Sequence, residues 1–360
     1  MGHLQYFLGA NSADGFVSLY DGLRQEGEFL WILKGGPGCG KSTFLRYVAA
    51  AAERAGYEAE RVLCSGDPDS LDAIRIPALR CCFADGTAPH VLEPDIPGAS
   101  SLYIDLGRFC NTDGLRAKES ELRSLLLRYR SLYAKAYRLL SAADNCMRVI
   151  EAEPALIPLR NHARERAVSF AARHLPRHGG DGGERELFLS AVCYLGRLRL
   201  NDTAEQLCNT LYYIENDLGL AEAYLGTLHA EAAARGLRVI RCPDPIRPDK
   251  TEALLLPELS LGFIVTRRGE SEVQKQHRHI RLDSSPAAAA LRADSRYLLR
   301  HAQELTADAV SALADAKAMH DELEQLYHPH VDFDAVLREA EAYAARILHK
   351  TRGSAYTETE

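Results

Sequence analysis

Apolar and polar positions in the N-terminal part of the chain predict short strands that alternate with helices. Residues 29–33, Phe-Leu-Trp-Ile-Leu, are apolar and β-prone without interruption, as in a buried strand. After them, apolar residues recur at the spacing of one helical face, at Phe44, Leu45, Val48 and Ala52. Further strands are predicted at residues 59–64, 79–84 and 102–104. This alternation indicates an α/β fold, and we expect a parallel sheet flanked by helices.

The following segment has a helical pattern. One long helix is predicted from Leu115 to about Ile150, where leucine and tyrosine residues recur on one side. Pro154 ends it, and a second helix to His174 would complete a helical hairpin at about residues 113–175. The glycine-rich residues 178–184 then predict a flexible linker between domains.

The chain after this linker repeats the chain before it. When each residue n is paired with residue n + 181, identical residues recur, among them Phe7 with Phe188, Gly15 with Gly196 and Gly38 with Gly219. We therefore expect two tandem domains, each with a helical hairpin. The expected boundaries are 1–177, a linker at 178–184, a second domain at 185–350 and a tail at 351–360.

Residues 34–43, Lys-Gly-Gly-Pro-Gly-Cys-Gly-Lys-Ser-Thr, match the phosphate-binding P-loop motif G-x-x-x-x-G-K-[ST]. The motif follows a predicted strand and precedes a predicted helix, which is the context it requires. Glycines let the backbone turn its N–H groups toward a phosphate, and the helix N-terminus adds its own. We expect Lys41 to contact the β- and γ-phosphates and Ser42 to bind Mg²⁺. The predicted nucleotide-binding residues are Gly35, Gly36, Pro37, Gly38, Cys39, Gly40, Lys41, Ser42 and Thr43.

Carboxylates at the ends of strands are candidate metal ligands. Asp85 ends an apolar strand and is predicted to bind Mg²⁺ together with Ser42, so we include it with Lys41 among the catalytic residues. Asp105 also ends a strand and is the alternative.

The acidic loop at residues 67–72 is predicted to end the second strand, at the edge where open α/β sheets bind ligands. Its first carboxylate, Asp67, is a candidate catalytic base or acceptor-binding group, and the alternative is a helix cap in a solvated turn. His90 is a candidate contact to phosphate or substrate, or a structural histidine. Arg267 and Arg268 could act as an arginine finger, although a solvated basic turn is the preferred interpretation.

The second copy lacks the phosphate-binding residues. Lys41 aligns with Glu222, Ser42 aligns with Ala223, and the metal-binding carboxylate aligns with Val265. Carboxylates in place of a lysine and glycines would repel a triphosphate. We therefore expect a pseudo-domain that keeps its fold and binds no nucleotide.

Composition limits the partners. The net charge of −7 and the pI of about 6.0 give no electrostatic case for nucleic-acid binding. The sequence has no apolar stretch long enough for a membrane span and no N-terminal signal-peptide pattern. Its nine cysteines form no C-x-x-C pair, which argues against a zinc site and a disulfide framework. We expect a cytoplasmic protein.

Four motifs carry a resemblance to a known family. Residues 64–72, 76–79 and 85–90, together with the P-loop, resemble those of a bacterial family of predicted ATP-binding proteins with two tandem P-loop halves. The resemblance covers nearly the whole chain and implies ATP binding without naming a substrate. Members are commonly intact in both halves, and this chain departs from them at residues 216–223.

We expect the protein to bind Mg²⁺-ATP and to hydrolyse it slowly, as a switch or regulatory ATPase. A kinase for a small molecule or nucleotide, and a nucleotide-sensing scaffold without turnover, are the alternatives. ATP is favoured over GTP because the guanine-recognition signature N-K-x-D is absent from the sequence. Beyond the nucleotide, an unidentified small molecule or protein partner is possible.

Overall fold

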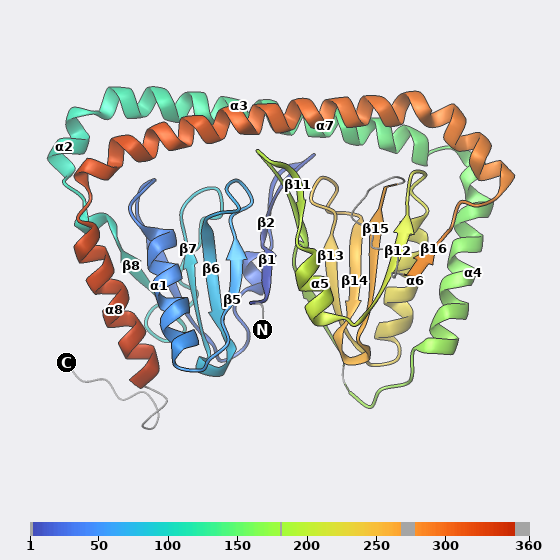
Figure 1. Cartoon of the computed structure of the whole chain (residues 1–360), viewed down its shortest axis with the longest axis horizontal. Helices are drawn as coiled ribbons and strands as arrows, with labels where there is room; N and C mark the ends of the chain where they lie inside the picture. Colours follow the sequence, from blue (N-terminus) through green and yellow to red (C-terminus); the bar gives the residue numbers. More distant parts are fainter. Residues whose placement is uncertain (1–2, 181, 268–277, 350–360) are drawn as a thin grey trace. The chain divides into compact units, whose positions relative to one another are not determined.

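The computed structural model describes residues 3–180, 182–267 and 278–349. The chain divides into two compact units, and each contains a six-stranded sheet with helices packed against it (Figure 1). The fold is therefore α/β, as predicted. Within the described residues, no helix is both long and apolar enough to cross a membrane. Unit 1 consists of Met1–Gly9, Ser18–Tyr133 and Ala312–Glu360, and unit 2 consists of Ala10–Val17 and Ala134–Ser311.

The sheet of unit 1 is mixed. Its strand order is β1-β5-β6-β7-β4-β8. β6 runs antiparallel to both of its neighbours, whereas the other pairs are parallel. The prediction of a parallel sheet is therefore wrong, because it did not include β6. The strands are β1 (Gln5–Phe7), β4 (Phe29–Lys34), β5 (Glu60–Leu63), β6 (Leu71–Ile76), β7 (Cys81–Asp85) and β8 (Ser101–Asp105).

β6 is antiparallel because the chain reverses in a tight turn after β5. The amide of Cys64 donates to the carbonyl of Ser70, and the amide of Ser70 donates to the carbonyl of Asp67. A parallel neighbour would need a crossover of about a dozen residues or more, which this short connection cannot supply. The 3₁₀ turn η2 (Pro77–Leu79) and the left-handed residue Arg80 then lead into β7.

Aromatic side chains fill the layer between this sheet and its helices. Trp31 of β4 lies against Phe83 of β7, and both contact Tyr343 of α8 (Phe333–His349). α8 also packs against α1 (Lys41–Arg54). The C-terminal helix thus completes the core of unit 1.

Unit 2 repeats this sheet strand for strand. Its order, β9-β13-β14-β15-β12-β16, corresponds to β1-β5-β6-β7-β4-β8 in unit 1. Ser260, at φ +51°, takes the place of Arg80, at φ +49°, in the turn before the fourth strand along the order. The internal repeat found in the sequence is therefore present in the fold. The strands are β9 (Gly183–Glu186), β12 (Thr210–Glu215), β13 (Arg238–Pro243), β14 (Thr251–Leu256), β15 (Leu261–Thr266) and β16 (Arg278–Ile280).

The helices differ from the predicted hairpins. The long helix predicted at residues 115–150 is present, but Lys118 separates it into α2 and α3. α4 packs against α6 and does not fold back along α3 (Figure 1), so the hairpin at about 113–175 is not formed. The remaining elements are α2 (Thr112–Ala117), α3 (Glu119–Glu151), α4 (Ile157–His174), α5 (Asn201–Leu207), α6 (Ala221–Ala233), α7 (Pro286–Tyr327), and two small sheets, β2 (Gly9–Ser12) with β3 (Gly15–Ser18) and β10 (Ser190–Cys193) with β11 (Gly196–Arg199).

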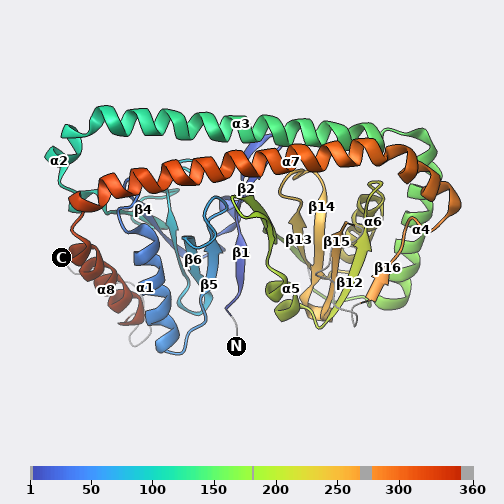
Figure 2. The same ribbon diagram turned by 45° about the horizontal axis from the view of Figure 1, so that its top comes forward.

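The two units also divide the chain differently from the expected boundaries at 177 and 185. α3 and α7 each contribute to both units. In unit 1 the two helices lie side by side (Figure 2), and Leu122 and Leu125 of α3 pack against Leu323 of α7. The expected linker at 178–184 is partly ordered, since β9 begins at Gly183 and pairs with β13. The tail at 351–360 lies outside the described residues.

Candidate functional site

The glycine-rich loop predicted as a P-loop connects β4 to α1 in unit 1. Gly38 and Gly40 have φ values of +67° and +82°. This conformation favours glycine, because the Cβ atom of any other residue would clash with the backbone there. The helix begins directly afterwards at Lys41, and the amide of Phe44 donates to the carbonyl of Gly40. The backbone therefore has the strand–loop–helix form that the motif predicts.

Lys41 and Asp85 meet at this loop. β7 pairs in parallel with β4, and this register places Asp85 beside Leu33, the penultimate residue of β4. Lys41 Nζ donates to the carbonyls of Gly35 and Gly36 at 2.9 Å each and lies 3.6 Å from Asp85 Oδ2. The lysine ammonium thus bridges the loop and the carboxylate.

The other oxygen of Asp85 is held by its own turn. Oδ1 accepts hydrogen bonds from the amide of Thr87 at 2.8 Å and from its hydroxyl at 2.7 Å. Asp105, the alternative, is exposed at the end of β8 and accepts a hydrogen bond from the amide of Gly107 at 2.9 Å. Of these two carboxylates, Asp85 is the one beside the lysine.

Ser42 and Asp72 lie on the same side of the loop. Ser42 Oγ accepts a hydrogen bond from the amide of Leu71 at 2.9 Å, so it is tied to the start of β6. Asp72, which the sequence placed in a loop, is the second residue of that strand and is buried. Its carboxylate accepts a hydrogen bond from the hydroxyl of Tyr20 at 3.2 Å. Burial raises the pKa of Asp72; His90 opposes this shift and Asp85 adds to it.

Asp67 lies in the turn between β5 and β6. Its carboxylate accepts a hydrogen bond from the hydroxyl of Ser70 at 3.1 Å and forms an ion pair with Lys317 of α7 at 3.5 Å. The turn itself closes through the backbone of Ser70 and Asp67. Asp67 therefore lies in a turn, as the alternative expected, but a strand follows this turn and Asp67 caps no helix. Its carboxylate also lines the cavity described next.

These side chains surround one cavity of about 510 Å³. Cavities of this size are typical of small-molecule sites. Lys41, Asp67 and Asp85 lie on its wall, and residues of α3 and α7 complete it. Sequence reasoning missed the residues from those helices, because no local motif marks them. They are Tyr129, Tyr133, Lys317, His320 and Glu324.

The end of α7 and the start of α8 pack directly on the loop. A Cβ added at Gly36 would lie 2.6 Å from Cε1 of Tyr327, and one added at Gly38 would lie 3.0 Å from Cδ2 of His328. At Gly40 the nearest atom would belong to Val336, at 3.1 Å. The loop glycines therefore also permit close approach of the C-terminal helices.

Cys39 lies inside the loop and is buried. Its Sγ is 3.3 Å from the Sγ of Cys110. Burial, followed by the contact with Cys110, raises the pKa of the Cys39 thiol to about 12. Cys39 is therefore a neutral packing residue at neutral pH.

Of the two arginine-finger candidates, Arg267 is not on this wall. Arg267 belongs to unit 2 and lines a separate cavity of about 80 Å³ there. Arg268 lies outside the described residues. In unit 1, Lys317 is the cation that α7 contributes to the cavity wall.

In unit 2 the corresponding loop has different partners. Glu222 Oε2 accepts a hydrogen bond from the amide of Thr251 at 2.8 Å, as Ser42 does from Leu71 in unit 1. A Cβ added at Gly219 would lie 2.6 Å from the carboxylate of Glu151. A carboxylate thus lies against the glycine that aligns with Gly38.

That carboxylate is held in place. Arg247 donates to both oxygens of Glu151 at 2.7 Å each. The side chains of the protein therefore provide both the anion and the cation at this loop, and this arrangement opposes the binding of a triphosphate.

Comparisons with protein-family models, with curated proteins and with solved structures found no match for this chain.

Proposed function

We propose that unit 1 is a P-loop NTPase domain that binds ATP with Mg²⁺. The observation that carries this proposal is the convergence of the glycine-rich loop, Lys41, Ser42 and Asp85 on one cavity of about 510 Å³. The loop amides and Lys41 would bind the phosphates. To do so, the ammonium group of Lys41 would leave the carbonyls of Gly35 and Gly36 and donate to phosphate oxygens. Ser42 and Asp85 would hold Mg²⁺, whose preferred ligands are oxygens.

We infer that hydrolysis is slow and serves regulation. Fast hydrolysis needs a base that accepts a proton from the attacking water. Asp67 is the candidate base on the cavity wall, and its carboxylate is already engaged by Lys317 at 3.5 Å and by the hydroxyl of Ser70 at 3.1 Å. The contact of α7 and α8 with the loop supports a regulatory role, because nucleotide at the loop would act on these helices.

A kinase is the second candidate, and the shape of the cavity favours it. Beyond Asp67 the wall continues to Tyr129, Tyr133 and His320. The ring centroids of Tyr129 and Tyr133 are 4.9 Å apart, and those of Tyr129 and His320 are 5.9 Å apart. Such a cluster would bind a planar acceptor next to the γ-phosphate.

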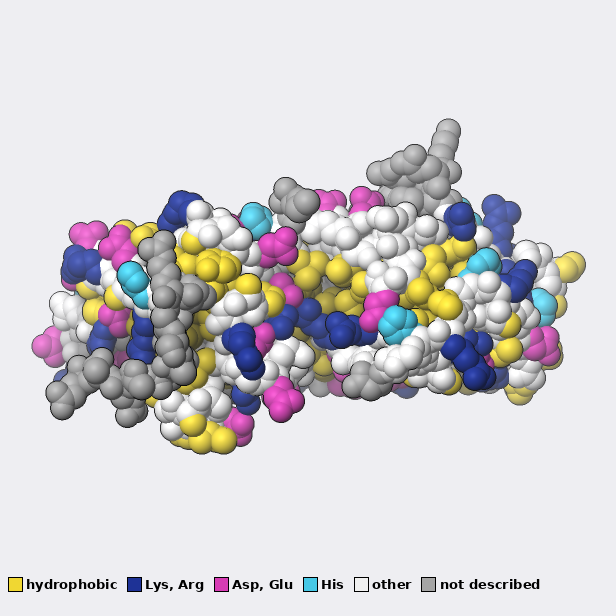
Figure 3. Space-filling model, turned by 90° about the horizontal axis from the view of Figure 1, so that it is seen from below, with side chains coloured by type: hydrophobic (Ala, Val, Ile, Leu, Met, Phe, Trp, Pro, Cys, Tyr) yellow, Lys and Arg dark blue, Asp and Glu magenta, His cyan; other side chains and the backbone are white. Residues whose placement is uncertain are grey.

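Surface charge and the cysteine side chains bear on the partners and the compartment that we propose for the protein. Lys, Arg, Asp and Glu side chains are interspersed on the face seen in Figure 3, which fits a protein that does not bind nucleic acid. All nine cysteines are free thiols, which fits a reducing compartment such as the cytoplasm. The absence of a guanine signature favours ATP over GTP.

Product analysis with labelled ATP tests this function. The purified protein is incubated with ATP and Mg²⁺, alone and with a pool of metabolites. We expect slow release of free phosphate, absent in Lys41→Ala and unchanged in Lys135→Ala, an exposed lysine on α3. Label on a metabolite would indicate the kinase instead, and no product with no bound ATP would contradict both.

A further inference from the structure

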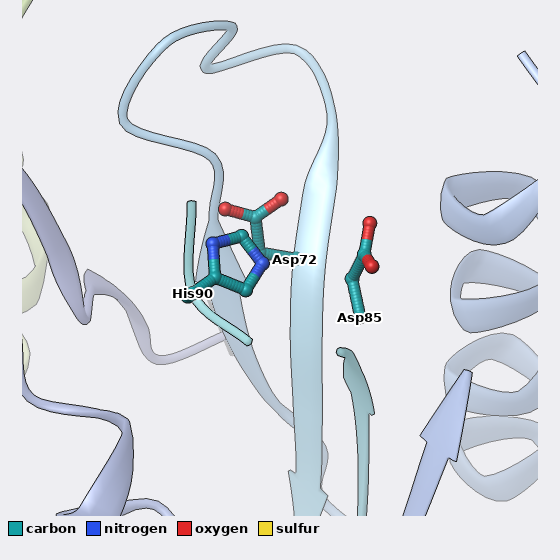
Figure 4. A group of neighbouring side chains, drawn as sticks. All are labelled: Asp72, Asp85 and His90. Carbon is teal, nitrogen blue, oxygen red and sulfur yellow. The ribbon is translucent and has the colours of Figure 1, made fainter. Parts of the chain in front are cut away.

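Three potential metal ligands converge beside the predicted phosphate site. Asp72 of β6, Asp85 of β7 and His90 from the segment after β7 each bring one ligand atom within 4.8 Å of the others (Figure 4). Two atoms bound to one ion at about 2.1 Å lie at most about 4.2 Å apart. Small movements of the side chains would therefore close this group around an ion.

The group contains a buried carboxyl group, Asp72, that has no lysine or arginine partner among the described residues. The side chains of Asp72 and His90 are 8% and 7% exposed. Among the described residues, no lysine or arginine forms an ion pair with Asp72, to which the hydroxyl of Tyr20 donates a hydrogen bond. A buried carboxylate requires a compensating positive charge.

In unit 2, which lacks the predicted phosphate-binding residues, the carboxylate at the position of Asp72 is paired with basic side chains. Glu252 is the second residue of β14, as Asp72 is of β6, and it is also buried. Arg197 and Arg199 lie 2.9 Å and 3.1 Å from its carboxylate. The position of Asp85 is taken by Val265, so in unit 2 two arginines from β11 pair with the buried carboxylate, and no second carboxylate stands at the position of Asp85.

We propose that Asp72, Asp85 and His90 bind a first-row divalent metal ion, such as Mn²⁺, without nucleotide. Two carboxylates with one imidazole suit such an ion, whereas Mg²⁺ prefers oxygen ligands alone. The site differs from the nucleotide-bound Mg²⁺ of the proposed function, in which Ser42 and the phosphates take part. Only Asp85 belongs to both.

Tyr20 orients two of the three ligands. Its hydroxyl donates to Asp72, and its ring stacks on His90 with centroids 4.6 Å apart and planes 9° apart. Partners of this kind fix the orientation of metal ligands and raise affinity. Tyr20 is therefore a positioning residue for this site.

Titration with Mn²⁺ alone, followed by electron paramagnetic resonance, tests the site. We expect one Mn²⁺ per chain and a pulsed spectrum with nitrogen coupling from an imidazole. His90→Gln should remove this coupling and weaken Mn²⁺ binding more than about tenfold. Asp105→Asn, at a strand end outside the group, should leave both unchanged.

Nitrogen coupling is measured on the wild-type protein, so the test does not depend on the folding of a variant. Failure of the wild type to bind Mn²⁺ without nucleotide, or binding without nitrogen coupling, would overturn the proposal. Neither result bears on ATP binding. Conversely, the Lys41→Ala variant should bind ATP much more weakly and should still bind Mn²⁺. The two proposals can therefore be refuted separately.

Discussion

At the scale of single residues, Asp85 is the carboxylate that we propose to hold the metal of the nucleotide site. It lies 3.6 Å from Lys41 and has one oxygen held by Thr87. We predict that Asp85→Asn folds and loses the Mg²⁺ dependence of ATP binding, because an amide holds a cation and its water shell poorly. ATP affinity measured with Mg²⁺ and with a chelator checks this.

Asp105→Asn is the matched control. It ends the strand on the other side of β4 and is exposed, so Mg²⁺ dependence should be retained. If Asp105→Asn removes this dependence while Asp85→Asn keeps it, the metal has been assigned to the wrong strand.

Glu28 makes stability depend on pH. Burial raises the pKa of this carboxyl group, but the hydrogen bonds from Arg75, at 2.7–3.0 Å, and from the amide of Gln25 outweigh it, so the pKa is lowered on folding. A lowered pKa stabilises the fold above the unfolded value, and this stabilisation is lost as pH falls through the folded value.

We therefore predict that Glu28→Gln lowers the free energy of unfolding by about 1–3 kcal/mol at pH 7. The difference from wild type should begin to shrink below about pH 4 and should be lost as pH falls through the lowered pKa of Glu28 in the folded protein. Urea titrations at several pH values measure it. A difference that is constant down to the lowest pH would show that the charge is not its source.

At the scale of elements, sequence patterns predicted four of the six strands in the sheet of unit 1 and missed β1 and β6. The apolar runs at residues 29–33, 59–64, 79–84 and 102–104 correspond to β4, β5, β7 and β8. β6 contains Asp72 and Arg75, which interrupt its apolar pattern. Arg75 is paired with Glu28 and Glu60, so its charge, which interrupts the apolar pattern, is neutralised only by the fold.

The same reason limits the prediction of the site. The loop, Lys41 and Asp85 follow from local motifs, because a strand, a loop and a helix fix their geometry. Tyr129 and Lys317 reach the cavity from helices far along the chain, and their place depends on how those helices pack. No local pattern carries that information.

The contact between α7 and the loop gives a prediction at this scale. A Cβ at Gly36 would lie 2.6 Å from the ring of Tyr327. We predict that Gly36→Ala destabilises unit 1 by about 1–3 kcal/mol, because the overpacked contact forces the ring or the loop to move. Thermal unfolding of unit 1 measures the loss.

The double variant Gly36→Ala with Tyr327→Ala separates this contact from other effects. If the ring is the obstacle, Gly36→Ala should lower the free energy of unfolding much less in the Tyr327→Ala background than in the wild type. The two effects would then be strongly non-additive. Additive losses would mean that Gly36 is needed for another reason, such as its backbone.

At the scale of the whole molecule, one chain carries two copies of a sheet with different loops. Unit 1 keeps a loop with glycines, a lysine and a hydroxyl. In unit 2 the helix begins at Ala221, as α1 begins at Lys41, and Glu222 accepts the backbone hydrogen bond that Ser42 accepts in unit 1, so the expected alignment of Glu222 with Lys41 is wrong by one residue. Glu151 lies against the glycine at 219. A triphosphate at unit 2 would meet carboxylates without enough donors, at a cost of several kcal/mol.

Calorimetric titration with ATP and Mg²⁺ tests the central claim most directly. We predict a stoichiometry near one nucleotide per chain. Lys41→Ala should weaken this binding by about 1.5–3 kcal/mol, roughly ten- to a hundredfold, because it removes a charge-assisted contact to phosphate. A stoichiometry near two, or wild-type affinity in Lys41→Ala, would contradict the account.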